Sequence, residues 1–422
     1  MTKNIYEDDL IPEGLNFNKA RIKVIGVGGG GGNAVSRMHE EGIKNVEFLI
    51  CNTDHQTLTS SPILDKLQLG TVLTRGLGAG CDPEKGRNAA IESIEEIKKM
   101  IGSHIEMVFI TAGMGGGTGT GAAPVIAKVA KEMGILTIAV VTTPIQDEGY
   151  ENLRRAYEGL EELRKYVDSL LIIDNQKIYD IYPDLMIVDA FKEADNVLTT
   201  AVKGITEIIT VKGYINVDMA DVKMVMKQSG VAIMGMGRGS GENRAITAVE
   251  EAFKSPLLND FDLKTAKNAL VNISSNEKNG ITSSELRSIM EYIHEYTGND
   301  IEKFKRGVVI DNSLPDGCIS ITVVATGFRM HIQAPAINKS KISEENILTL
   351  TDETEEDPNK IELSAPVSSE TTSSINFRHI NIKDIAIYTP DINISDYENE
   401  SALSRRERAK KLRLEKEQAN EQ

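Results

Sequence analysis

Six glycines within residues 111–124 are the residues of this chain best suited to bind a ligand. They lie between an apolar run at residues 107–110, typical of a buried strand, and a helical pattern at residues 125–133. Glycine has no Cβ atom to keep a ligand away, so consecutive backbone N–H groups can turn inward and bind an anion. The following helix adds the positive end of its dipole, and Pro124 suits its first turn. This stretch predicts a loop for a phosphate chain, but not a Walker loop, because it contains no lysine.

Two further glycine loops are predicted at residues 26–33 and 76–80. The first follows a predicted strand and by itself matches the dinucleotide-binding fingerprint, with Asp54 as the acid for a ribose. That pattern leaves a nicotinamide-dependent oxidoreductase as an alternative, although the nearby His39 and His55 have no evident partner for acid–base catalysis. Three glycine loops around one ligand favour a nucleoside di- or triphosphate instead.

A second group of polar residues consists of Asn216, Asp218 and Asp221 and follows a long helical pattern. Carboxylates three residues apart at the start of a helix share one face, where they could act together in catalysis. The same spacing is also that of a helix N-cap with a solvated first turn. The residues alone leave both interpretations open.

The order of the predicted elements places the glycine loops at one edge of a sheet. Strands are predicted at residues 20–26, 46–50, 107–110, 136–142 and 169–173, with helices between them at 34–41, 83–100 and 124–133. Alternating strands and helices predict an α/β fold with a parallel, doubly wound sheet. Ligands of such sheets bind beyond the carboxyl ends of the strands, where all three loops are predicted to lie.

A long central helix and a second, smaller α/β domain are predicted after this sheet. Residues 185–212 are assigned to the helix, whose wide apolar stripe includes Phe191, Leu198 and Ile205. Residues 213–330 form the second domain, with strands at 231–236, 269–273, 306–310 and 320–325 and helices at 242–253 and 283–296. The glycines within residues 235–241 are expected to form a strand-to-helix turn without a ligand.

Composition limits the partners. The chain has 422 residues and a formal net charge of −16, which disfavours binding to nucleic acid or to an anionic membrane surface. Three cysteines without metal spacing suggest reduced thiols in a cytoplasm. No apolar run reaches the roughly 18 residues that span a bilayer, so direct membrane insertion is not expected.

The two ends of the chain are predicted to lie outside the folded domains. Residues 1–19 are expected to form a flexible arm, residues 331–378 an acidic disordered linker, and residues 379–422 a tail that binds partners. Within this tail an apolar segment at 380–390 precedes a basic, helix-prone one at 404–413. The basic segment is interpreted either as a binding surface or as a solvated helix.

The motif at residues 115–121 resembles the tubulin signature, and residues 20 to about 328 resemble the FtsZ family of bacterial tubulin-like GTPases. The resemblance implies a tubulin-like GTP-binding domain at 20–184, with GTP as substrate and Mg²⁺ as its ion. It also implies head-to-tail polymerisation of this chain with itself into the filaments of the septal ring. A cytoplasmic location at the division site follows, with membrane-tethering division proteins as partners of the tail.

The same resemblance implies roles for individual residues. The phosphates would be surrounded by residues of the three loops: Gly28, Gly29, Gly30, Gly31, Gly32, Asn33, Gly78, Ala79, Gly80, Gly115, Gly116, Gly117, Thr118, Gly119 and Thr120. The ribose and base would be contacted by Glu148, Asn175, Phe191 and Asp195. Because a carboxylate such as Asp195 accepts two hydrogen bonds and guanine presents N1–H and N2–H, guanine is the predicted base.

For hydrolysis the resemblance implies catalysis in trans, with Asp218 and Asp221 positioning the attacking water at the γ-phosphate of the next subunit and Asn216 orienting it. One position departs from the family pattern, because Asn152 replaces the usual arginine near the sugar and phosphates. Either Arg155 substitutes for that arginine or nucleotide binding is weakened. A filament-forming homologue with weak or lost GTP turnover is therefore the alternative function.

Overall fold

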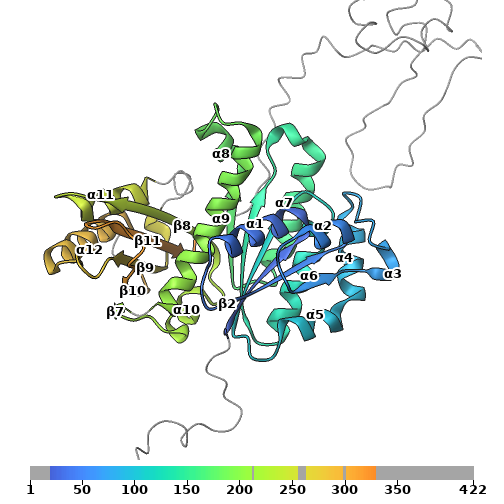
Figure 1. The fold of residues 1–422 in the computed structure, drawn as a ribbon, viewed down its shortest axis with the longest axis horizontal. Helices are drawn as coiled ribbons and strands as arrows, with labels where there is room; N and C mark the ends of the chain where they lie inside the picture. Colours follow the sequence, from blue (N-terminus) through green and yellow to red (C-terminus); the bar gives the residue numbers. More distant parts are fainter. Residues whose placement is uncertain (1–19, 212, 255–262, 298–300, 329–422) are drawn as a thin grey trace, which may run out of the picture. The chain divides into compact units, whose positions relative to one another are not determined.

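The computed structural model describes residues 20–211, 213–254, 263–297 and 301–328. The predicted N-terminal arm, acidic linker and partner-binding tail lie outside these residues. The described part contains one sheet of eleven strands in the order β3-β2-β1-β4-β5-β6-β8-β11-β9-β10-β7 (Figure 1). The predicted α/β fold is confirmed.

The first six strands of this order are parallel throughout. They are β1 (Ile22–Val27), β2 (Val46–Asn52), β3 (Lys66–Gln68), β4 (Met107–Gly113), β5 (Leu136–Thr143) and β6 (Ser169–Asp174). All residues of β1 and β5 are buried, as expected for strands covered on both faces. Strand β3 was not predicted, because three half-buried residues leave no periodic signal.

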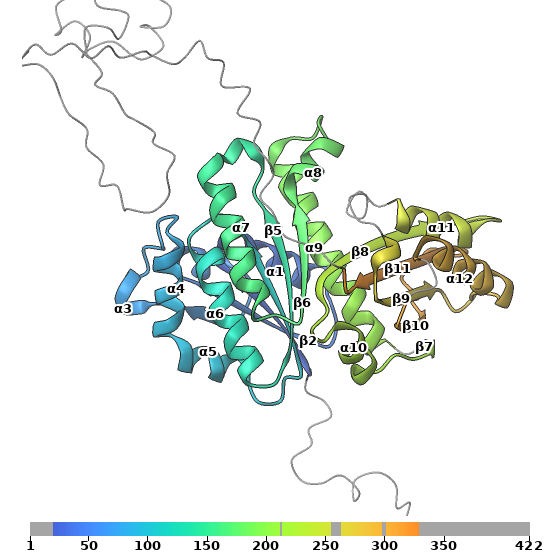
Figure 2. The same cartoon turned by 180° about the vertical axis from the view of Figure 1, so that it is seen from behind.

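Helices cover both faces of the parallel sheet. They are α1 (Gly28–Glu40), α2 (His55–Ser60), α3 (Thr71–Thr74), α4 (Pro83–Glu92), α5 (Ile94–Ile101), α6 (Thr118–Glu132), α7 (Tyr150–Arg164) and α8 (Asn175–Ile181). Val24 of β1 belongs to the core beneath α1, whereas the next residue, Ile25, belongs to the core beneath α5 and α6. Accordingly, α1 lies in front of the sheet in Figure 1, and α6 and α7 lie in front in Figure 2.

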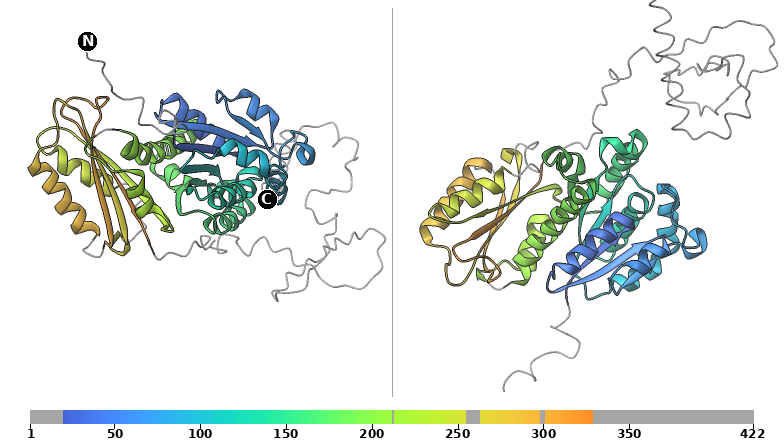
Figure 3. Two further views of the ribbon diagram at one scale, coloured as in Figure 1. Left: turned by 90° about the horizontal axis from the view of Figure 1, so that it is seen from below. Right: turned by 45° about the horizontal axis from the view of Figure 1, so that its top comes forward.

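The predicted central helix is α9 (Ile187–Thr210), whose 24 residues span about 36 Å at 1.5 Å per residue. It packs beside α1 (Figure 3). Leu198 and Ile205 belong to its buried stripe, as predicted. Phe191 does not, because its side chain is 45% exposed near the start of the helix.

The second part of the sheet begins at β8 (Gly230–Gly239), which pairs with β6 in parallel over three residues. Strands β11 (Ile319–Thr326) and β9 (Asn268–Ser275) follow in antiparallel order, then β10 (Lys303–Ile310) and the short β7 (Gly213–Ile215). The remaining elements are α10 (Met219–Met226), α11 (Arg244–Phe253), α12 (Ser283–Thr297) and the short 3₁₀ turns Gln146–Glu148 and Leu263–Thr265.

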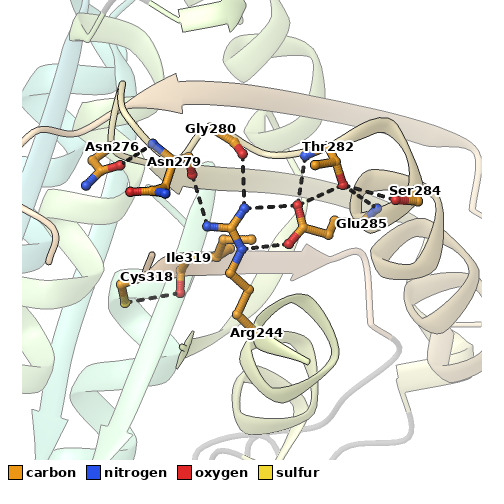
Figure 4. Close-up of polar contacts among 9 residues, drawn as sticks. All are labelled: Arg244, Asn276, Asn279, Gly280, Thr282, Ser284, Glu285, Cys318 and Ile319. Atoms are coloured by element: carbon orange, nitrogen blue, oxygen red, sulfur yellow. Dashed lines mark hydrogen bonds and ion pairs between the residues drawn. The ribbon is translucent and has the colours of Figure 1, made fainter. Parts of the chain in front are cut away.

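An ion pair between the buried Arg244 and the half-buried Glu285 joins α11 and α12 in this second domain (Figure 4). The Arg244 guanidinium donates to both carboxylate oxygens of Glu285, at 2.6 and 3.0 Å, and to the carbonyls of Asn279 and Gly280 at 3.0 Å. Thr282 donates to Glu285 through both its N–H and its hydroxyl. The hydrogen bond from Arg244 is the main favourable cause that lowers the pKa of Glu285 to about 2.

Three predicted helix bounds were wrong. Helix α1 begins at Gly28 rather than at residue 34, and α6 begins at Thr118, so that Pro124 lies inside it. Glycine's low helix propensity masked these first turns, but tertiary packing overrides it. The predicted helix at 83–100 is broken at Ser93, whose hydroxyl accepts a hydrogen bond from the N–H of Gly70 at 3.0 Å.

The prediction for residues 235–241 was also partly wrong. Gly237 and Gly239 lie inside β8, and the turn to α11 follows this strand. A Cβ atom on either glycine would collide with the backbone of α11. These glycines therefore allow a helix to pack closely on a strand.

Candidate nucleotide site

The three glycine segments meet at the carboxyl edge of the parallel sheet. A Cβ atom placed on Gly28 would lie 2.9 Å from the backbone nitrogen of Gly119, so the first and third segments touch. A Cβ on Gly117 would lie 2.8 Å from the Ala79 Cβ, which places the second segment beside the third. The side chain of Thr53, after β2, contacts Thr118 with 2.7 Å between the hydroxyl oxygens.

The glycines at this edge serve two purposes. Gly31 packs against the carbonyl of Thr111, and Gly119 against the carbonyl of Gly113, so closely that neither position has room for a Cβ atom. By contrast, a Cβ on Gly29 or on Gly116 would meet no atom within 4 Å. The first kind lets the starts of α1 and α6 pack closely on β4. The second leaves open space at those helix starts, where backbone N–H groups favour an anion.

The third loop is held by its own helix. The hydroxyl of Thr120, which is buried, accepts a hydrogen bond from the N–H of Gly115 at 2.8 Å. Gly115 has a φ of +103°, which favours glycine, and both Pro144, after β5, and Asn152 of α7 pack against it. A cavity of about 220 Å³ adjoins the first segment and is lined by residues that include Gly28, Gly32 and Asn33.

Two acceptors near the predicted base site have no strong partner. Asn175 begins α8, and its side-chain Oδ1 is buried without a hydrogen-bond partner among the described residues. Burial raises the pKa of the Asp195 carboxyl to about 6, and the nearby charge of Arg37 opposes this only partly. The Arg37 Nε instead donates to the Asn196 side chain at 3.1 Å. Such acceptors fit a ligand edge that carries N–H donors.

The predicted ribose and stacking residues are exposed. Phe191 lies one helical turn before Asp195 on α9. Glu148 follows β5, and one of its carboxylate oxygens accepts a hydrogen bond from the N–H of Ile145 at 3.1 Å. Part of the Glu148 carboxylate is therefore used to hold its own turn.

Asn152, Arg154 and Arg155, at the start of α7, each have different partners. The Asn152 side chain donates to the carbonyl of Glu148 at 3.0 Å. Arg154 is paired with Glu151 and Glu158. Arg155 instead reaches the end of the second glycine segment, where its guanidinium donates to the carbonyl of Cys81, the residue after Gly80, at 2.9 Å.

The acidic group of Asn216, Asp218 and Asp221 lies at the start of α10. Asp218 is the N-cap of α10: its carboxylate accepts from the N–H of Asp221 at 2.8 Å, and Asp221 accepts from the N–H of Asp218 at 3.3 Å. Asn216 Oδ1 accepts from the N–H of Gly213 at 2.8 Å. The capping interpretation of this spacing is thus correct, and it leaves a catalytic role open because Asp218 and Asn216 are exposed.

The acidic group and the glycine segments are at opposite ends of the same strands. Lys223 of α10 pairs with Glu106 at 3.1 Å, and Glu106 directly precedes β4. The third glycine segment follows the other end of β4, whose seven residues span about 23 Å at roughly 3.3 Å each. The structure does not bring Asp221 to the nucleotide edge of its own subunit.

The residues that supported an oxidoreductase have local partners. Asp54 caps α2, accepting from the N–H of Gln56 at 2.8 Å and from the Thr57 hydroxyl at 2.9 Å. His55 contacts Gln68, and His39 packs edge-on against Phe48. These contacts weaken the oxidoreductase interpretation.

Some polar residues at this edge were missed in the sequence. Thr53 directly follows β2, and Thr143 ends β5, where its hydroxyl donates to Asp174 at 3.1 Å. Their position at the carboxyl end of a buried run was the available signal. In the described ranges no three His, Cys, Asp or Glu residues are grouped to hold a metal ion, and no helix there is long and apolar enough to cross a membrane.

Comparison with known proteins agrees with this geometry. The tubulin/FtsZ family GTPase domain matches residues 21–183, and the FtsZ family C-terminal domain matches residues 230–329. The cell division protein FtsZ of Pseudomonas aeruginosa is 49% identical over 324 residues, covering 75% of this chain and 79% of that protein. An FtsZ dimer structure from M. jannaschii has a TM-score of 0.68 at 44% identity and covers 73% of this chain and 88% of that one. The structure of CetZ1 from Haloferax volcanii shares the fold, with a TM-score of 0.65 at 20% identity. This match covers 74% of this chain and 96% of that one. The chain belongs to the FtsZ family of tubulin-like GTPases.

Proposed function

We propose that this GTPase polymerises head to tail into the filaments of the cell-division ring and hydrolyses GTP where two subunits meet. The observation that carries the proposal is the separation of its two polar groups. The glycine segments lie beyond one end of β4, and Asp221 lies near the other. A subunit that stacks on a copy of itself brings these two groups together, whereas one subunit cannot.

The space at the nucleotide edge fits a phosphate chain. The starts of α1 and α6 lie side by side, and the open positions at Gly29 and Gly116 leave room for phosphate oxygens next to backbone N–H groups. Side chains at these positions would fill that room. The glycines thus support binding of a nucleoside triphosphate by backbone groups and not by a lysine.

Guanine is the base that the free acceptors support. The Asp195 carboxylate can accept hydrogen bonds from the N1–H and N2–H groups of guanine, and the unpartnered Oδ1 of Asn175 is a further acceptor nearby. Adenine presents an acceptor at N1, which a carboxylate would repel. Phe191, exposed one turn before Asp195, is placed to stack on the base.

In hydrolysis a water oxygen attacks the γ-phosphorus and the bond to the β–γ bridging oxygen breaks, which yields GDP and phosphate. We propose that Asp218 and Asp221 of the next subunit hold and polarise that water, and that Asn216 orients it. Only one oxygen of the Asp218 carboxylate is used in capping α10. The other is available to accept a hydrogen bond from the water.

Mg²⁺ is proposed as the ion that accompanies GTP. It prefers six oxygen ligands and usually keeps several waters while it binds substrate phosphates. The described residues hold no cluster of carboxylates for it at the nucleotide edge. The phosphates would therefore supply most of its ligands other than water.

Exposed apolar side chains support contact between copies. Beyond β6, Leu185, Met186 and Val188 are 41%, 72% and 61% exposed. At the acidic end, Tyr214 and Met224 flank Asp218 and Asp221 and are 66% and 39% exposed. Different apolar surfaces at the two ends suit a head-to-tail contact, which does not close on itself and therefore produces filaments.

Location and tail partners complete the proposal. A filament of this kind acts in the cytoplasm at the division site, and the tail links it to membrane-tethering division proteins. The tail lies outside the described residues, so this part rests on the family and on the apolar and basic segments of the tail sequence.

The test is GTP turnover measured over a range of protein concentrations, with light scattering recorded in parallel. Turnover per subunit should rise steeply above a threshold concentration, together with scattering. Asp221→Ala should scatter but turn over GTP only at a small residual rate, and Glu96→Gln, which removes an exposed carboxylate of α5, should behave like the unmodified chain. Turnover that does not depend on concentration would place the whole site in one subunit. Assembly without turnover in the unmodified chain would favour the alternative of a filament-forming homologue.

A further inference from the structure

Lys305 of β10 contacts the acidic pair from a distant part of the sequence. Its Nζ lies 2.6 Å from Asp221 Oδ1. The second oxygen of this carboxylate accepts the hydrogen bond from the N–H of Asp218. Both oxygens of Asp221 thus have a donor within the subunit, while the Lys305 and Asp221 side chains remain 37% and 27% exposed. The Asp221 carboxylate is therefore accessible to a neighbouring subunit, while its orientation is fixed by Lys305 and by the N–H of Asp218.

The sheet fixes where Lys305 lies. Strand β7 pairs with β10, and Ile215 lies opposite Val308. This pairing brings the segment that follows β7, including Asp218 and Asp221, next to β10, and α10 packs on β9 and β10. A lysine on a paired strand is a more rigid support than one on a loop.

Electrostatic repulsion explains why the Asp221 carboxylate needs to be held in place. Two carboxylates that approach a triphosphate are repelled by it, and each would lower its own repulsion by turning away. The ammonium of Lys305 offsets one of these charges. Its hydrogen bond is also the main cause that lowers the pKa of Asp221, and it therefore favours the ionised carboxylate.

We infer that Lys305 is a positioning residue for GTP hydrolysis, which fixes the orientation of the Asp221 carboxylate before the neighbouring subunit arrives. The inference rests on the proposed function of Asp221 in trans. Lys305 acts through Asp221 and not on the nucleotide. The second oxygen of Asp218, which is not used in the cap, then accepts a hydrogen bond from the water. The position of this water relative to Asp221 is thereby fixed.

Lys305→Met and Lys305→Arg test the inference, and Lys303→Met is the matched control. Lys303 is exposed, lies two residues earlier on the same face of β10, and has no ion pair among the described residues. Lys305→Met should lower kcat by on the order of 10- to 100-fold, the usual effect of a misplaced reacting group. GDP affinity, and assembly with a non-hydrolysable GTP analogue, should be unchanged. Lys305→Arg should recover most of the turnover, and Lys303→Met should lose none.

A double-mutant cycle with Asp221→Ala then separates the possible roles. If Lys305 acts through Asp221, the double variant should turn over GTP at the same residual rate as Asp221→Ala alone. Further loss in the double variant, unimpaired turnover of Lys305→Met, or failure of both Lys305 variants to assemble would each overturn the inference. Full turnover by Asp221→Ala would instead overturn the proposed function.

Discussion

The Arg155 guanidinium donates a hydrogen bond to the carbonyl of Cys81 at 2.9 Å, which ties α7 to the residue that directly follows the second glycine segment. Arg154, its neighbour, is held by Glu151 and Glu158 and cannot make this contact at the same time. Asn152 occupies the position of the usual family arginine, and its side chain is bonded to Glu148. Of the two arginines, Arg155 is therefore the one that we propose to compensate for Asn152.

Arg155→Ala should weaken GTP binding. The bond to Cys81 holds the end of the second segment, and a displacement of this segment that costs about 1 kcal/mol of binding free energy corresponds to a roughly 5-fold loss of affinity. A lost contact with phosphate would add to this. Arg154→Ala removes a cation of the same helix without touching Cys81 and should leave affinity unchanged. Titration of a fluorescent GTP analogue measures both. Equal affinities for Arg155→Ala and the unmodified chain would show that Arg155 does not compensate.

Asp195→Asn should change base preference. A carboxylate accepts from both N1–H and N2–H of guanine, whereas an amide offers one donor and one acceptor. Xanthine presents N1–H together with a carbonyl at C2, which matches the amide. The variant should lose GTP affinity by about 10-fold or more and bind xanthosine triphosphate better than the unmodified chain does. Competition with both nucleotides measures this, and an unchanged preference would place the base elsewhere.

Nucleotide affinity should also fall in mild acid. Burial raises the pKa of Asp195 to about 6 in the free protein, and the ligand needs the ionised form. Protonation competes with binding below that pKa, so affinity should be nearly constant above pH 7 and weaker by about 10-fold at pH 5. Asp195→Asn, which has no carboxyl to protonate, should show a much smaller change. A pH dependence that survives this substitution would assign the effect to another group.

The parallel sheet and the ends of its strands could be predicted because each strand is a short apolar run before a polar or glycine-rich turn. Helix starts within glycine runs could not, since packing of Gly31 on Thr111 and of Gly119 on Gly113 overrides local propensity. The break at Ser93 depends on a bond from Gly70, which no local pattern indicates.

In the site, too, features with a local sequence signal could be predicted, whereas contacts between distant segments could not. The glycine segments were located because composition and position in the strand order agree. The contacts of Arg155 with Cys81 and of Lys305 with Asp221 join segments that are far apart in the sequence, and a single exposed cation leaves no periodic signal. The roles assigned to individual site residues stay predictions until variants are measured.

Gly31→Ala and Gly29→Ala should separate packing from binding. The added methyl group would collide with the carbonyl of Thr111 in the first variant and meet no atom within 4 Å in the second. Gly31→Ala should lower the free energy of unfolding by about 1–3 kcal/mol or more. Gly29→Ala should keep stability, or gain up to about 1 kcal/mol, yet bind GTP more weakly because its methyl group enters the phosphate space. Urea denaturation and nucleotide titration distinguish them, and a stable, GTP-binding Gly31→Ala would contradict this division.

The Arg244–Glu285 pair should make the stability of the second domain depend on pH (Figure 4). The pKa of Glu285 falls from 4.5 to about 2 on folding, mainly through the Arg244 hydrogen bond. A depressed carboxyl pKa stabilises the folded state above pH 4.5 and loses that effect as the pH falls towards 2. Allowing for solvent screening, the effect is about 2 kcal/mol.

Glu285→Gln should therefore lower the free energy of unfolding by about 2 kcal/mol at pH 7, and the difference from the unmodified chain should shrink steadily below pH 4.5. Urea denaturation at a series of pH values, followed by circular dichroism, measures it. Glu291→Gln removes an exposed carboxylate from the same helix and should change stability by less than about 0.5 kcal/mol at every pH. If the two variants lost the same stability, or if the Glu285→Gln difference persisted at pH 2, the charge on Glu285 would not be what stabilises the contact between α11 and α12.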